Sequence, residues 1–279
     1  DSPMPHFGLA HAAGPNPNSR YGGLPDDPNG AGLDAIRRAL ALANNGSQRE
    51  RDMINALFVL YNKDAIPDSR ERDFAFVDAM RNLHDQYPDD ADIATIFGES
   101  YMNTTRWDYW DEDGIAKAGT AEAQAAFESA MRSEHDHPGA NHLYIHLMEA
   151  SAQPELAMPS AQKLESLVPI SGHMVHMPGH IYLLCGEYEK AKTASEAAIL
   201  VNRKYLSYAG PYNYYTTARC HDLHLMMYTC MLLGQFEPAM AAAEEICENL
   251  PPDVIDLKDK PFIAGTMEGY FAMRMHVLV

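Results

Sequence analysis

The chain has 279 residues, of which 46% are hydrophobic, and a formal net charge of −18 from 21 basic and 39 acidic side chains. This length allows one large core, one solenoid or two domains. The charge argues against a nucleic acid or an anionic membrane as partner, since both repel an acidic protein. No stretch of about 18 apolar residues predicts a membrane span, and no signal peptide is visible, so we expect a cytoplasmic location.

The cysteines show neither CxxC spacing nor the density of a disulfide scaffold. We therefore expect free thiols, mostly buried, in a reducing compartment. They are Cys185, Cys220, Cys230 and Cys247.

The pattern along the chain predicts an all-α protein, because no window shows strand alternation bounded by turn residues. Ser47, Asp68 and Asp90 stand at expected helix starts, where their side chains can cap the first turn. The expected helices span about 5–13, 31–44, 48–61, 69–86, 90–103, 120–133, 138–151, 154–167, 173–185, 187–204, 212–233, 236–249 and 263–278.

Two irregular stretches interrupt the first half of the chain. Residues 14–28 are rich in Pro, Gly and Asn, and a loop of this length is often functional. Residues 106–114 hold both tryptophans beside four carboxylates, without the spacing of an EF-hand calcium loop. Two interpretations of the second stretch stay open: structural packing, or the wall of a substrate pocket.

Histidines recur at a fixed offset in the second half. His142 and His146 are four residues apart, as are His176 and His180, and 176 − 142 = 34. Thirty-four residues is the period of a tetratricopeptide repeat, a helix–turn–helix unit that stacks into a solenoid. The pairs therefore fall at equivalent places of successive repeats.

A second marker extends the register. The phrase around Gly186, with Tyr188 and Ala191 after it, returns 48 residues later around Gly234. Because 48 = 34 + 14, fourteen residues are inserted, and we place them in the stretch 204–217. The same offset leads from His176 to His224. The tyrosines in the inserted stretch are expected mostly to pack, although phenols beside a redox metal would also suit oxidative chemistry.

Residues four apart lie on one face of a helix, so each pair can aim two imidazoles at one point. His221 and His224 form a third pair, and Glu149 extends the first row as a ligand or general base. Imidazole with a neighbouring carboxylate suits zinc, iron or copper. An unmetallated polar network and chance remain the alternatives. The predicted metal ligands are His142, His146, His176, His180, His221 and His224.

Other polar residues near these phrases receive different predictions. Asp222 is expected to point away from the histidine face into solvent. His135, His137 and His173 stand at helix starts, where capping and turn roles are expected.

Three phrases carry a resemblance to a known family. PHFGLAHAAGPNPN, HPGANHLYIHLMEAS and GHMVHMPGHIYLLCGEYEKA resemble a mainly bacterial group of tetratricopeptide-repeat (TPR) proteins that are named only for their repeats. The resemblance implies the fold and no established reaction. Members of the group continue further, and the final phrase GYFAMRMHVLV resembles a helix without its partner, so we expect truncation at one or both ends.

The sequence thus predicts a single TPR-like α-solenoid over residues 1–279, with divergent hairpins in 1–118 and regular repeats in 119–279. The histidines are expected on its concave face. The favoured function is a metal-dependent enzyme, oxidative or hydrolytic, that acts on a small molecule. The alternative is a scaffold that binds a peptide or protein in its groove, with histidines that are structural or recognise the ligand.

Overall fold

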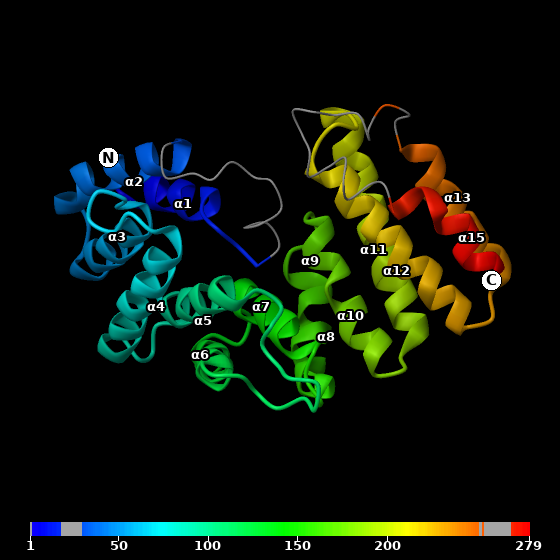
Figure 1. The fold of residues 1–279 in the computed structure, drawn as a ribbon, viewed down its shortest axis with the longest axis horizontal. Helices are drawn as coiled ribbons and strands as arrows, with labels where there is room; N and C mark the ends of the chain where they lie inside the picture. Colours follow the sequence, from blue (N-terminus) through cyan, green and yellow to red (C-terminus); the bar gives the residue numbers. More distant parts are fainter. Residues whose placement is uncertain (1, 18–29, 251–252, 254–268) are drawn as a thin grey trace. The chain divides into compact units, whose positions relative to one another are not determined.

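The computed structural model describes residues 2–17, 30–250, 253 and 269–279, and every regular element in these ranges is a helix (Figure 1). Within these ranges the only strand-type pairing is an isolated bridge between Trp110 and Ala116. The prediction of an all-α chain is therefore confirmed. No helix of the described ranges is long and apolar enough to cross a membrane.

The chain divides into two compact units, residues 1–143 with 150–152, and residues 144–149 with 153–279. The boundary falls inside the helix α7 (Pro138–Met148). The predicted solenoid, its concave face and its division at residue 118 stay predictions.

In the first unit, each helix packs against its neighbour in sequence. The helices before α7 are α1 (Met4–Ala13), α2 (Ala31–Leu42), the 3-10 turn η1 (Ala43–Asn45), α3 (Gln48–Tyr61), α4 (Ser69–Gln86), α5 (Ala91–Thr105) and α6 (Thr120–Ser133).

The helix starts of this unit follow from side-chain caps. The Ser47 hydroxyl accepts from the Glu50 backbone N–H at 3.2 Å, and the Glu50 carboxylate accepts from the Ser47 N–H at 2.6 Å. This reciprocal arrangement satisfies two donors that a helix start leaves unpaired. Asp68 and Asp90 cap α4 and α5 in the same manner, each accepting from the backbone N–H three residues later. The three predicted caps are confirmed.

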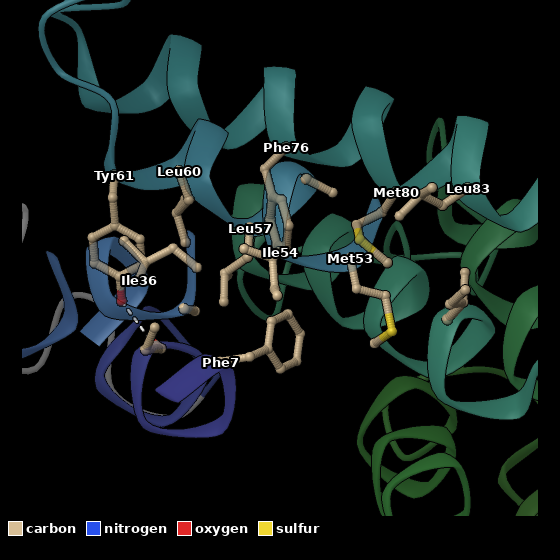
Figure 2. Close-up of a cluster of buried hydrophobic side chains, with 14 of the residues drawn as sticks. Phe7, Ile36, Met53, Ile54, Leu57, Leu60, Tyr61, Phe76, Met80 and Leu83 are labelled. Carbon is tan, nitrogen blue, oxygen red and sulfur yellow. Dashed lines mark hydrogen bonds between the residues drawn. The ribbon is translucent and has the colours of Figure 1, made fainter. Parts of the chain in front are cut away.

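The core of the first unit forms where α1 to α4 meet (Figure 2). Phe7, Ile54 and Phe76 come from three different helices and are almost completely buried. The hydroxyl of Tyr61 donates to the Ala10 carbonyl at 2.5 Å, which joins the end of α3 to α1. Burial of side chains of this size supplies most of the free energy that holds such helices together.

The Trp-containing loop 106–114 is held by its own hydrogen bonds. Tyr109 is completely buried, and its carbonyl accepts from the Thr120 hydroxyl at 2.7 Å. The Asp111 carboxylate accepts from the backbone N–H groups of Asp113 and Ile115. These contacts support the packing interpretation. Most of the other predicted loop lies outside the described residues, as does the start of the predicted helix 263–278.

The second unit continues from α7 with η2 (Pro154–Ala157), α8 (Met158–Leu167), α9 (Gly172–His176), α10 (Pro178–Leu184), α11 (Tyr188–Ala209), α12 (Tyr214–Leu232), α13 (Phe236–Asn249), η4 (Gly269–Ala272) and α15 (Met273–Leu278). Its longest helices, α11 and α12, pack side by side, and α13 packs on α12 (Figure 1).

Two turns of this unit have the same geometry. Gly186 and Gly234 both adopt left-handed backbone angles, with φ of +79° and +69°. In each turn the next residue donates its N–H to the carbonyl five positions earlier, from Glu187 to Tyr182 and from Gln235 to Cys230. This is the Schellman ending of a helix, which favours glycine. The two turns support the 48-residue register.

The predicted helices 187–204 and 212–233 leave residues 205–211 as their connection. In the structure α11 runs to Ala209 and α12 begins at Tyr214, so the connection is shorter than expected and most of the stretch 204–217 is helical. Fourteen residues correspond to about four helical turns, which two neighbouring helices can share. Of the tyrosines expected mostly to pack, Tyr205 lies with its ring 4.2 Å from that of Tyr215, whereas Tyr208 is 91% exposed.

Candidate metal centre

The segment that carries His176 and His180 is divided between two helices. The predicted helix 173–185 is broken at Met177, because Pro178 lacks the N–H that a helix interior requires. The two histidines nevertheless converge: their Nε2 atoms are 2.8 Å apart and their ring centroids 4.7 Å apart. Although they lie on two short helices, the two imidazoles therefore still point toward each other, as the sequence predicted.

His221 completes a group of three. It lies on α12, and its ring centroid is 4.6 Å from that of His176 and 5.5 Å from that of His180. Each of the three offers one ring nitrogen, and these nitrogens lie within 4.8 Å of one another. We call this set the second triad. It can hold a metal ion.

A first triad consists of His142, His146 and His173, whose ligand nitrogens also lie within 4.8 Å of one another. His142 precedes His146 by one turn of α7. The Nε2 atoms of His146 and His173 are 3.4 Å apart. His173, for which we expected a capping or turn role, therefore also belongs to a group that can hold a metal. For His137 the same expectation is confirmed, since its Nδ1 accepts from the Ala140 N–H at 3.0 Å.

The Glu149 carboxylate contacts one histidine of each triad. In both contacts it approaches Nδ1, the ring nitrogen that points away from the other histidines. One carboxylate oxygen lies 2.9 Å from Nδ1 of His146, and the other lies 2.6 Å from Nδ1 of His180. A carboxylate at Nδ1 fixes the tautomer that leaves Nε2 free as a ligand. Burial favours a raised pKa for Glu149, but the charges and hydrogen bonds of His180 and His146 lower it. Glu149 as a general base stays a prediction.

Asp222 supports the buried His176 from behind. The expectation that Asp222 is solvated is wrong: it is 2% exposed, and its Oδ1 lies 3.0 Å from Nδ1 of His176. Its other oxygen accepts from the Asn202 amide at 2.6 Å. Asn202 lies directly over Gly172, where an added Cβ would stand 2.1 Å from the Asn202 Oδ1. Gly172 thus makes room for the polar chain behind the ligand.

Three of the triad histidines, His173, His176 and His221, are in the form that binds metal. Burial, reinforced by neighbouring imidazoles, lowers the pKa of His173 and of His221 to about 3. The pKa of His176 is lowered well below its ordinary value for the same reasons. These three side chains are therefore neutral near pH 7, with lone pairs available.

The nitrogen spacings fit a metal ion. Two imidazoles on one tetrahedral metal at about 2.0–2.1 Å place their nitrogens about 3.3 Å apart. The 3.4 Å between His146 and His173 matches that value, and the 2.8 Å between His176 and His180 requires a small opening. No cysteine belongs to either triad, and burial raises the pKa of Cys220, the neighbour of His221, to about 12.

His224 lies apart from both triads, although the register predicted it as a ligand. Its ring lies 5.9 Å from that of Tyr270 and 6.1 Å from that of His276. The five other predicted ligands all belong to the triads. Sequence reasoning missed two contributors, His173 and Asp222, and their only signal was that each is close in sequence to a predicted ligand.

We compared the chain with protein families and with curated proteins, and neither comparison found a match. The candidate centre therefore rests on the residues described above.

Proposed function

We propose that the second unit binds a transition metal through its clustered histidines and is a metal-dependent enzyme of oxidative or hydrolytic type. The observation that carries the proposal is the second triad, in which three ring nitrogens converge while carboxylates stand behind two of the rings. An ordinary polar network requires neither the convergence of three ring nitrogens nor carboxylates behind the rings. Carboxylate–histidine–metal relays are typical of functional metal sites.

The protein's own residues would each perform a definite task. His176, His180 and His221 supply nitrogen ligands, Asp222 orients His176, and Glu149 orients His180. When bound by three protein ligands, a transition metal supplies a Lewis acid with an open position for water or substrate. His176 is completely buried, which strengthens the electrostatic interactions around that ligand.

The test is metal analysis of the purified full chain, followed by loading with cobalt(II) as a spectroscopic probe. We expect near-stoichiometric metal, a visible cobalt spectrum, and a change in that spectrum when azide is added to an open position. His176→Ala together with His180→Ala is expected to abolish the part of the spectrum that azide changes. His135→Ala, which alters an exposed histidine, is the matched control. Absence of bound metal in the parent protein would refute the proposal.

A scaffold that binds a peptide is the second candidate, because the second unit also contains a cavity of about 340 Å³. Glu165 of α8, Val175 of α9 and Lys190 of α11 are among the residues that line it. Such a scaffold would retain its partner after His176→Ala and would lose it after Ala194→Trp, a change that fills the cavity. Retention of cobalt binding in the Ala194→Trp variant would show that the two features are independent.

A further inference from the structure

The two triads share Glu149. Its two oxygens bind different imidazoles, His146 of the first triad and His180 of the second. A single carboxylate thereby fixes the orientation of one ligand in each set. Two unrelated metal sites would not require a common supporting residue.

The imidazoles also form an unbroken row. The ring of His173 lies 5.5 Å from that of His146, which lies 6.3 Å from that of His180. The ring of His180 in turn lies 4.7 Å from that of His176. Only the contact between His146 and His180 separates the triads. Ions held in the two sets would therefore be neighbours.

The ligand sets are alike in chemistry. Each consists of three imidazoles, and neither includes a thiolate or a carboxylate. Calcium, magnesium and manganese prefer oxygen ligands, whereas imidazole suits zinc, copper, iron and nickel. Among divalent ions, copper binds such nitrogen sites most tightly. Two sets of imidazole ligands without thiolate or carboxylate thus suit copper.

We propose that the two triads together hold a pair of neighbouring copper ions, each bound by three imidazoles. This inference rests on the proposed metal-binding function and goes further, since that function requires one ion of unspecified identity. The ligands of one ion are His142, His146 and His173, and those of the other are His176, His180 and His221. Glu149 is the positioning residue common to both.

The first measurement is the number of copper ions per chain. The full chain is stripped with a chelator, loaded with copper(II) in the presence of equal zinc(II), freed of excess metal and analysed for both elements. We expect about two copper ions in the parent and in His135→Ala, and about one in His173→Ala and in His221→Ala. His173→Gln and His221→Gln, which preserve more side-chain volume, serve if the alanine variants do not fold.

The outcomes separate this inference from the proposed function. One ion in the parent, or zinc in preference to copper, overturns the copper pair and leaves the metal-binding function in place. No ion of any kind overturns both. Retention of two ions after loss of His173 overturns the assignment of the first triad.

The second measurement tests whether the ions are neighbours. Copper(II) ions that interact through a short bridge give an electron paramagnetic resonance signal smaller than their total content. We expect the doubly loaded parent to show such a deficit, and the singly loaded His173→Ala and His221→Ala variants to show full intensity. Full intensity from two ions in the parent would contradict a coupled pair.

Discussion

Asp222 Oδ1 lies 3.0 Å from Nδ1 of His176, and both side chains are almost fully buried. Asp222 follows His221 in α12, so adjacent residues of one helix approach the same imidazole from different sides. His221 lies beside the His176 ring as a further candidate ligand, and Asp222 lies at Nδ1, while Nε2 of His176 faces His180. This contact explains why a carboxylate is buried in the second unit.

Replacement of this carboxylate should weaken metal binding without loss of the fold. Asp222→Asn preserves the size of the side chain and replaces the carboxyl group that lies beside Nδ1 of His176. Loss of such a supporting group typically lowers metal affinity about 10–100-fold, and we expect a decrease in that range. Competition with a chromophoric chelator measures the affinity, and circular dichroism reports the helix content.

Glu244→Gln is the matched control, since it removes an exposed carboxylate from α13 in the same unit. We expect its metal affinity to equal that of the parent. Equal affinities for parent and Asp222→Asn would show that Asp222 is a structural residue without influence on the ligand.

Gly172→Ala should destabilise the second unit. The new Cβ would stand 2.1 Å from the Asn202 side chain, which is itself buried and bonded to Asp222. Overpacking of this kind costs about 1–3 kcal/mol in the free energy of unfolding. Urea denaturation followed by circular dichroism provides the measurement.

Gly8→Ala is the control, and we expect it to raise the free energy of unfolding, because it places a methyl group in open space on α1. Alanine in a helix interior is more favourable than glycine by about 0.5–1 kcal/mol. An equal effect of the two substitutions would contradict the tight fit at Gly172.

Local features of the fold could be predicted from the sequence, and contacts between helices could not. Ser47 and Asp68 start helices because a cap depends only on the next three residues. His142 and His146 share a face because helix periodicity fixes it. The role of Asp222 depends on how α12 is rotated against α9, which no local pattern determines. Likewise, the contact of His173 with His146 and the place of His224 beside Tyr270 and His276 depend on how separate helices pack.

Acid should weaken the first unit through the ion-pair group around Arg49. The Arg49 side chain contacts Asp90 and Asp92, and His137 Nε2 lies 3.2 Å from Asp92. The pKa of Asp92 is lowered to about 2, mainly by its hydrogen bond to His137. Burial raises this pKa, and the hydrogen bond to Arg49 lowers it further. A carboxylate with a lowered pKa in the folded state stabilises the protein above its unfolded pKa, and this stability is lost as the pH falls.

The window for Asp92 lies between its ordinary pKa of 3.8 and the folded value of about 2. Because the Asp92 side chain is 60% exposed, solvent screening limits its contribution to under about 1 kcal/mol. We expect Asp92→Asn to be slightly less stable than the parent at pH 7, with a difference that shrinks towards pH 2. Urea denaturation at pH 7, 4 and 3 would show this, and a constant difference would contradict it.

Tyr61→Phe should loosen α1 from the first unit. Its hydroxyl donates to the Ala10 carbonyl at 2.5 Å in a fully buried setting, and the substitution leaves that carbonyl without its donor. An unpaired buried acceptor costs about 1–3 kcal/mol. We expect a loss of this size in the free energy of unfolding, together with faster amide hydrogen exchange in α1.

Tyr87→Phe, which removes a partly buried hydroxyl bonded to Asp52 at 2.8 Å, is the control and should leave the exchange of α1 unchanged. Equal acceleration of exchange in α1 by both variants would indicate general destabilisation and contradict a specific role of Tyr61 in holding α1.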